Sequence, residues 1–78
     1  MTIEQFSQVL RQLREERGWS QEQLAERADL NRSYLGEVER GRAVPSIVTV
    51  AKLAGALEIQ LSSFIARCES PLPQAGEG

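Results

Sequence analysis

The chain has 78 residues, and its 11 acidic and 9 basic side chains give a formal net charge of −2 at neutral pH. A chain of this length forms one small domain near the lower limit for a self-sufficient core, so contact with a second copy would help to stabilise it. The sequence has no apolar run of about 20 residues, which argues against a transmembrane helix. Because it has one cysteine and no histidine, an internal disulfide is excluded and we expect no metal or other cofactor.

The character of the N-terminus and the lack of catalytic motifs narrow the function classes further. Residues 1–18 are charged and amphipathic, unlike the apolar segment of a signal peptide. The lone Cys68 fits a reducing compartment, so we expect a cytoplasmic protein with no membrane contact. We find no paired carboxylates, nucleophile–base set or glycine-rich phosphate loop, and therefore expect a protein that is not an enzyme.

The first predicted helix covers residues 3–17. Its apolar residues recur at steps of three and four, the pattern of one buried helix face: Ile3, Phe6, Leu10 and Leu13. Thr2 is a suitable N-cap, and Gly18 is suited to ending the helix in a left-handed conformation. Arg11 and Arg17 lie on the other side, where we expect them to be solvated.

The middle of the chain predicts two short helices joined by a tight turn. Ser20 and Gln23 form a capping-box pattern at the start of a helix over 21–28. Asn31 is a good N-cap for the next helix, over 32–40. Helices this short are not stable alone, so the pair makes sense as a helix-turn-helix packed on neighbouring helices, with its second helix presented outward.

Two more helices are predicted in the C-terminal part, one over 47–57 with Ser46 as its cap and a short one over 63–67 with Ser62 as its cap. The apolar residues of the longer helix wrap around more than one face: Ile47, Val48, Val50, Leu53 and Leu57. The end of the chain is rich in Pro, Gly and Glu. We therefore expect a folded domain at 1–68 and a disordered tail at 69–78.

Several motifs stand out in this arrangement: Arg14, the S-Q-x-x-L-A run at Ser20–Ala25, Leu30, Tyr34 and the E-R-G run at Glu39–Gly41. Together they resemble the motifs of the Cro/C1-type helix-turn-helix family of phage and bacterial repressors. The resemblance covers roughly residues 4–67. Within the family, N-R-S-Y-L at 31–35 and V-E-R-G-R at 38–42 look most like the small controller proteins of restriction–modification systems.

The resemblance implies an all-α fold, a compact five-helix repressor-like DNA-binding domain whose second and third helices form the helix-turn-helix. It also implies a structural ion pair between Arg14 and Glu39, which would clamp the first helix to the end of the third. One position departs from the family pattern, because Asp29 stands where the family usually has a turn glycine. Aspartate tolerates the left-handed conformation better than most residues, so we expect the turn to form with some strain.

Residues near the start of the second helix of a helix-turn-helix reach base edges in the major groove. We therefore predict four base-reading residues: Arg32, Ser33, Gly36 and Glu37. Arg32 is suited to a bidentate pair with guanine, and Glu37 to accepting from the cytosine amino group while limiting non-specific binding by repelling phosphate. Gly36 either permits close approach to DNA or only weakens the helix.

Phosphate contacts are predicted for four residues: Gln21, Tyr34, Arg40 and Arg42. In related repressors a glutamine at the position of Gln21 bonds a phosphate, and free amides at a helix start favour the same anion; simple capping is the alternative. Tyr34 is either a phosphate ligand or a core aromatic, and Arg40 either a phosphate ligand or structural. Together with Arg32, the two arginines form a local basic patch despite the acidic total, but long-range steering toward DNA is weak.

We expect a sequence-specific transcription regulator that binds a pseudo-palindromic operator as a homodimer, with control of a restriction–modification system as the narrower hypothesis. The expected partners are double-stranded operator DNA, a second copy of the chain and RNA polymerase. The alternatives are a generic phage-like or metabolic repressor, and a helical adaptor or antitoxin-like module that does not bind DNA.

The dimer interface is predicted from surplus apolar surface on the last two helices, at the edge of the fold. Its residues are Ile47, Val48, Leu61, Phe64 and Ile65. The alternative for Leu61 and Phe64 is a place in the protomer's own core.

Overall fold

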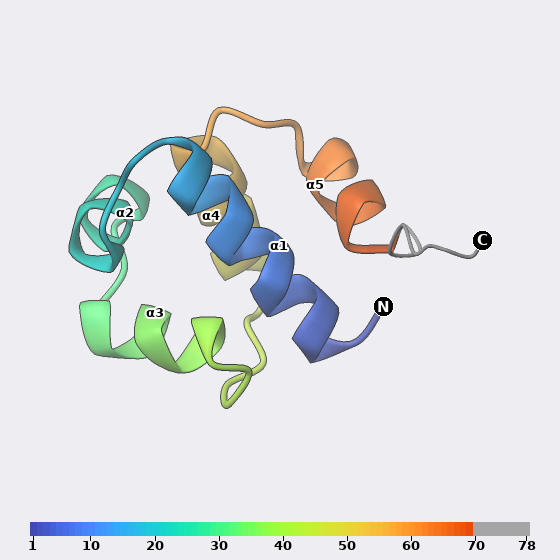
Figure 1. Ribbon diagram of the computed structural model, residues 1–78, viewed down its shortest axis with the longest axis horizontal. Coiled ribbons are helices and arrows are strands. Elements are labelled where there is room, and N and C mark those ends of the chain that lie inside the picture. Colours follow the sequence, from blue (N-terminus) through green and yellow to red (C-terminus); the bar gives the residue numbers. More distant parts are fainter. Residues whose placement is uncertain (70–78) are drawn as a thin grey trace.

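A computed structural model describes residues 1–69, which fold into five α-helices (Figure 1). In chain order these are α1 (Ile3–Glu16), α2 (Gln21–Ala28), α3 (Arg32–Glu39), α4 (Ile47–Ala56) and α5 (Leu61–Glu69). No strand occurs in this part of the chain, and the predicted all-α class is confirmed. Each of the first four helices starts where the sequence predicted and ends within one residue of its predicted end.

The helix α5 is longer than the predicted span of 63–67. The amide of Phe64 donates to the carbonyl of Gln60 over 2.9 Å, so the helix begins before Ser62. The predicted cap at Ser62 is therefore wrong, because that residue already lies within the first turn.

The C-terminal end of α5 changes the predicted domain boundary. Cys68 is buried, which holds the last turn of the helix against the core. Glu69 is helical and is therefore not the first residue of a tail. The rest of the predicted tail, residues 70–78, lies outside the described residues.

Polar side chains cap the first four helices at their N-terminal ends, as the sequence predicted. The capping residues are Thr2, Ser20, Asn31 and Ser46, whose side chains accept hydrogen bonds from backbone amides over 2.9–3.2 Å. The backbone amides of Thr2 and Ser20 in turn donate to the side-chain oxygens of Gln5 and Gln23, which completes two capping boxes. Each such cap contributes about 1 kcal/mol to the stability of its helix.

Four helices end in the same way, at a residue with left-handed backbone. These residues are Gly18, Asp29, Gly41 and Glu58, with φ of 71°, 57°, 73° and 58°. In each case the amide that follows reaches back over the last turn, as from Leu30 to the carbonyl of Ala25 over 2.8 Å. The turn at Asp29 therefore has the geometry that a glycine would give it, at the cost of left-handed backbone in a residue with a side chain.

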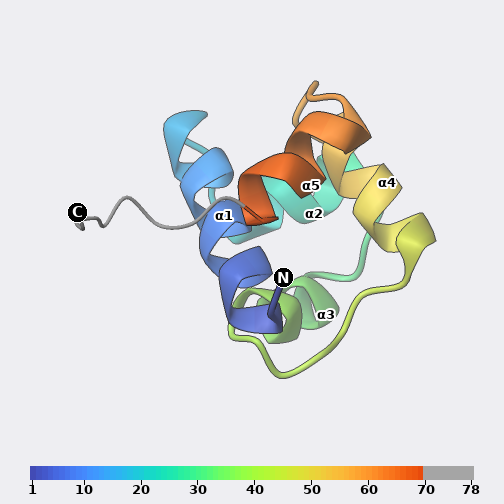
Figure 2. The same cartoon turned by 90° about the vertical axis from the view of Figure 1, so that its right-hand side faces the viewer.

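The core lies where α1, α4 and α5 meet the helix-turn-helix. α2 packs on α3 and α4, α1 packs on α3 and α5, and α4 packs on α5. The largest fully buried apolar side chains come from all five helices: Leu10, Leu24, Leu35, Leu53 and Phe64. The rings of Phe6 and Phe64 stack with centroids 5.3 Å apart, which fixes α5 beside α1 (Figure 2).

No single helix within residues 1–69 is long and apolar enough to cross a membrane. The pair α4 and α5 reaches the required length and composition only when taken together, and the two helices are bent by 106° at the break between them.

Replacing Glu58 by glycine is expected to stabilise the fold by about 0.5–1 kcal/mol. Left-handed backbone costs a non-glycine residue about 1–2 kcal/mol, and the greater freedom of glycine in the unfolded chain offsets about half of that. Urea unfolding measures the difference. Glu58→Ala is the control, because it also removes the exposed ion pair with Arg17 at 3.6 Å but keeps the left-handed strain. Equal unfolding free energies for the two variants would contradict this prediction.

Candidate nucleic-acid interface

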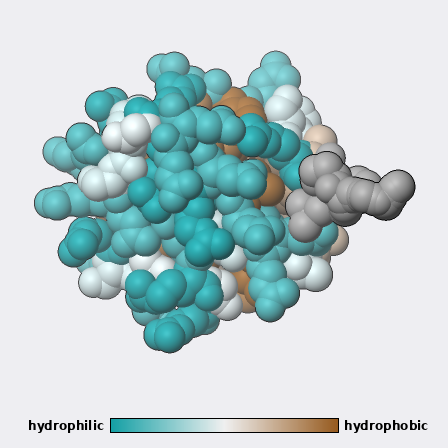
Figure 3. All heavy atoms as spheres, viewed as in Figure 1, coloured by the Kyte–Doolittle hydropathy of each residue, from teal (hydrophilic) through white to brown (hydrophobic). Residues whose placement is uncertain are grey.

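The helix α3 lies at the lower edge of the molecule in both ribbon views, with one side on the core and the other in solvent (Figures 1 and 2). Leu35 and Val38 are fully buried and attach the helix to the core. Arg32 and Ser33 at its N-terminal end are exposed. The face of the molecule seen in Figure 3 is mainly hydrophilic, and hydrophobic atoms show only in narrow gaps.

A shallow hollow of about 320 Å³ lies between the start of α2 and the exposed side of α3. Its lining residues are Gln21, Arg32, Ser33, Gly36, Glu37 and Arg40. The structure therefore brings together all four predicted base-reading residues and two of the four predicted phosphate ligands. Tyr34 and Arg42 do not line the hollow.

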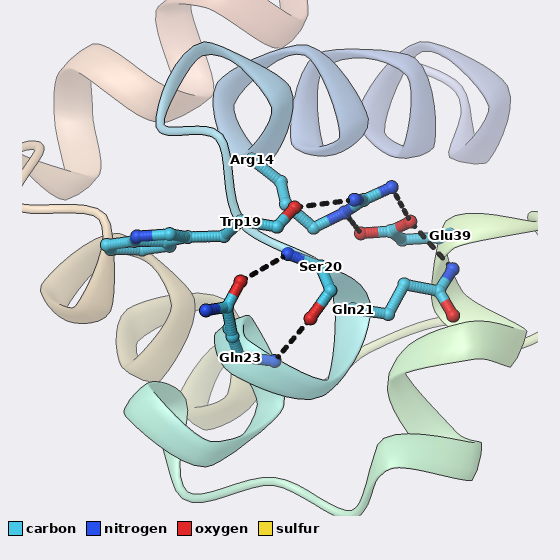
Figure 4. Close-up of polar contacts among 6 residues, drawn as sticks. All are labelled: Arg14, Trp19, Ser20, Gln21, Gln23 and Glu39. Carbon is cyan, nitrogen blue, oxygen red and sulfur yellow. Dashed lines mark hydrogen bonds and ion pairs between the residues drawn. The ribbon is translucent and has the colours of Figure 1, made fainter.

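A buried ion pair joins α1 to the end of α3 beside this hollow (Figure 4). The Arg14 Nε and Nη2 atoms donate to the two carboxylate oxygens of Glu39 over 2.8 and 3.0 Å. The Arg14 Nη1 atom donates to the carbonyl of Trp19 over 2.9 Å. The Glu39 side chain is 1% exposed and that of Arg14 is 14% exposed. The ion pair that the resemblance implied is therefore present and largely shielded from water.

The side chain of Gln21 is part of the same network, which the sequence did not predict. Its Nε2 atom donates to Glu39 Oε1 over 2.9 Å, so the carboxylate accepts from residues of both α1 and α2 (Figure 4). An amide group carries two N–H donors, and the second one is not used within residues 1–69. The residues are 18 positions apart, so no local spacing pattern signals the contact.

The side chain of Arg40 is also engaged. Its Nη2 atom pairs with Glu37 Oε2 over 2.5 Å, one turn back on the same helix, and both side chains are partly exposed. A methyl group placed on Gly36 would lie 3.3 Å from Arg40 Nη1, so the guanidinium lies against bare backbone at this glycine. The spacing of three residues is a known signal for such a pair and was available in the sequence.

Tyr34 and Arg42, the other two predicted phosphate ligands, differ in their surroundings. Tyr34 is partly buried and packs against the core, which is the environment of the core-aromatic alternative. Arg42 is exposed, and its amide bonds to the carbonyl of Glu37 over 2.9 Å. Within residues 1–69 its guanidinium has no hydrogen bond or ion pair.

The predicted interface residues separate into exposed and buried ones. Ile47 and Val48 are 66% and 61% exposed, whereas Leu61 and Ile65 are partly buried against the core. Phe64 is 0% exposed because its ring stacks on Phe6 inside the protomer. Its assignment to the interface is therefore wrong, and the alternative place in the protomer's own core is the observed one.

The described residues offer little for metal or thiol chemistry. Within residues 1–69 no group of three His, Cys, Asp or Glu side chains could hold a metal ion. Cys68 is a free, buried thiol, and burial raises the pKa of that thiol above its usual value. A thiol that stays protonated is a poor nucleophile.

Two helices joined through a left-handed residue, with the second exposing a polar face beside the start of the first, define a helix-turn-helix domain. A helix-turn-helix family model (HTH_3) matches residues 10–64, which include all of α2, α3 and α4. The chain belongs to this family of DNA-binding transcription regulators, which are not enzymes.

Two relatives illustrate the family. The chain is 39% identical over 68 residues to the HTH-type transcriptional regulator SutR of Escherichia coli strain K12, covering 87% of this chain and 38% of SutR. It is 48% identical over 58 residues to the immunity repressor protein of Bacillus phage phi105, covering 74% of this chain and 40% of the repressor. The chain thus spans less than half the length of these two relatives.

A solved structure of a small regulator matches over nearly its whole length. The restriction–modification controller protein C.AhdI from Aeromonas hydrophila superposes with a TM-score of 0.77 at 47% sequence identity. The match covers 80% of this chain and 94% of C.AhdI.

Replacing Glu39 by alanine is expected to destabilise the fold by about 3 kcal/mol or more. The change leaves the Arg14 guanidinium nearly buried without a carboxylate and removes the acceptor of Gln21. Thermal and urea unfolding measure the loss. Arg11→Ala is the matched control, because Arg11 is exposed on the same helix as Arg14 and its removal is expected to change stability by less than about 0.5 kcal/mol. The same melting temperature in both variants would show that the pair is not a clamp.

Proposed function

We propose that this protein is a sequence-specific transcription regulator that binds a pseudo-palindromic operator as a homodimer. The observation that carries the proposal is the hollow at the start of α2 and α3, whose polar lining combines donors and acceptors on an exposed helix. A major groove is wide enough for one helix, and its base edges carry a distinct donor and acceptor pattern for each base pair. Residues at the N-terminal end of α3 then meet those edges.

In this arrangement Arg32 is the main base-reading residue. It is exposed at the first position of α3, and no hydrogen bond or ion pair within residues 1–69 engages its side chain. Its guanidinium is therefore available for a bidentate pair with guanine. Ser33 next to it is a second, shorter donor to a base or phosphate.

Phosphate contacts would come from both sides of α3. Gln21 has one amide N–H available at the start of α2, where free backbone amides favour the same anion. Arg42 is exposed after the C-terminal end of α3, and its guanidinium has no ion-pair partner among residues 1–69. Tyr34 would add its hydroxyl only if that group reaches past the core contacts of the ring.

The homodimer would form on α4 and α5. Ile47 and Val48 are large apolar side chains that the protomer leaves mostly exposed, and such surface marks an interaction site. Leu61 and Ile65 would extend it on α5. In a two-fold dimer the same patch meets itself, and the two copies of α3 would be set about 34 Å apart for successive major grooves.

Control of a restriction–modification system is the narrower form of the proposal. It is supported by C.AhdI, a controller protein of which the matched region covers 94%. The second candidate is a generic repressor, which the 48% identity to the phage phi105 immunity repressor favours. The neighbouring genes distinguish a controller protein from a generic repressor, because an adjacent endonuclease or methyltransferase gene is expected only for a controller.

Replacing Arg32 by alanine is expected to cost about 1–3 kcal/mol of operator affinity and to relax the preference at one base pair per half-site. The operator is first selected from a library of randomised duplexes with the wild-type protein, and affinities are then measured by fluorescence anisotropy over a range of salt concentrations. Arg11→Ala, on the exposed side of α1, is the control.

Wild-type affinity for DNA should fall steeply with salt, because phosphate contacts release counterions. An affinity for the selected duplex that does not depend on salt would favour the alternative of a protein-interaction module. Unchanged affinity and sequence preference in the Arg32 variant would exclude this residue as a reader.

Replacing Ile47 by aspartate is expected to give a folded monomer. The side chain is 66% exposed in the protomer, so the charge does not disturb the core, but it would be buried against its own copy in a two-fold interface. Sedimentation over micromolar concentrations measures the assembly, and Lys52→Gln on the same helix, which makes the net charge more negative by the same one unit, is the control. A wild-type protein that stays monomeric at all concentrations yet binds one operator tightly would overturn the proposed assembly.

A further inference from the structure

Gly36, Glu37 and Arg40 lie against one another on α3, where the guanidinium of Arg40 covers the buried Gly36. The Arg40 Nη2 atom lies 2.5 Å from Glu37 Oε2. A methyl group on Gly36 would meet Arg40 Nη1 at 3.3 Å and Nη2 at 3.4 Å. The guanidinium therefore lies directly against the space that a side chain at Gly36 would fill, and all three residues line the hollow of the proposed DNA interface.

The pairing changes what Arg40 offers to DNA. A guanidinium bound to a carboxylate carries almost no net charge as a unit, and a phosphate would have to displace Glu37 to bind it. Arg42, two residues on, has no such partner within residues 1–69. The two arginines therefore differ in the number of counterions that their binding to phosphate would release. Arg42 would neutralise a phosphate without giving up an ion pair, whereas Arg40 would first have to leave Glu37.

The ion pair with Arg40 also changes how Glu37 would contact a base. A lone carboxylate in the major groove is repelled by the phosphates on both sides, and a flexible glutamate loses side-chain freedom when it binds. Arg40 cancels the charge and restricts the rotamer through Oε2, which leaves Oε1 with free lone pairs. A carboxylate oxygen held in this way accepts a hydrogen bond from the exocyclic amino group of cytosine.

We infer that Arg40 is a positioning residue that holds Glu37 as a cytosine-selecting acceptor, and that Gly36 provides the space for this arrangement. Arg40 is then not a phosphate ligand. The inference rests on the proposed function, since it assigns roles within the same DNA interface.

The test compares a double variant that keeps the net charge with a variant that removes one cation from the same surface. The double variant Glu37→Ala/Arg40→Ala removes the pair and its acceptor oxygens without changing the net charge, and Arg42→Gln removes the cation of Arg42. Each protein is titrated against the duplex that the wild type selects from a randomised library and against duplexes with each base substitution in it. The double variant is expected to keep the wild-type slope of log affinity against log salt, but to lose about 5- to 150-fold discrimination at one C·G pair per half-site. Arg42→Gln is expected to reduce that slope by about 1 and to keep the base preference.

A third variant, Gly36→Ala, separates positioning from charge. The added methyl group displaces the guanidinium by a few tenths of an ångström and leaves every charge in place. Alanine also favours the helix over glycine, so the melting temperature should not fall. The expected result is weaker discrimination at the same base pair with an unchanged salt slope, which a merely structural role of Arg40 would not produce.

Three results would overturn the inference. A slope reduced by about 1 in the double variant would make Arg40 a phosphate ligand. Retained discrimination in the double variant would exclude Glu37 as a reader, and retained discrimination in Gly36→Ala would exclude the positioning role. Each of these leaves the proposed function standing, whereas failure of the wild type to bind any duplex in the library would overturn both.

Discussion

The buried carboxylate of Glu39 is the group on which the arrangement of the first three helices depends. It accepts from Arg14 on α1 and from Gln21 at the start of α2, and Arg14 reaches the Trp19 carbonyl between those helices. A charge that is 99% hidden from water is costly unless all of its partners keep their places, so α1, α2 and α3 share one geometry. Because Gln21 also lines the hollow, the network that holds the fold together also shapes the surface proposed to face DNA.

Local signals predicted most of the fold, and long-range contacts account for what was missed. Capping residues and helical periodicity located four helices, because both act within a few positions of the chain. The start of α5 was placed too late because Ser62 resembles a cap, whereas the buried side chains of Phe64 and Cys68 decide the extent of that helix. The bond between Gln21 and Glu39 joins residues far apart in the chain, and periodicity does not say whether an apolar side chain faces its own core or a second copy.

The acidic total charge is compatible with a DNA-binding surface because of how the acids are distributed. On α3 itself Glu39 is neutralised by Arg14 and Glu37 by Arg40. Elsewhere Glu58 lies near Arg17. At physiological ionic strength charges separated by more than about 8 Å are largely screened, so distant acids weaken long-range attraction more than close contact. The surface around α3 is thus locally basic within a protein whose net charge is −2.

The stacked rings of Phe6 and Phe64 join α5 to α1 by direct side-chain contact. From α1 the Arg14–Glu39 pair continues the connection to α3, so packed side chains link the C-terminal helix to the helix that would enter the groove. In a dimer built on α4 and α5 the separation of the two reading helices would then be a fixed length rather than an adjustable one. An operator whose half-sites are one base pair too far apart would have to bend or untwist to fit, and the stiffness of the DNA between the half-sites would become part of the sequence that the protein selects.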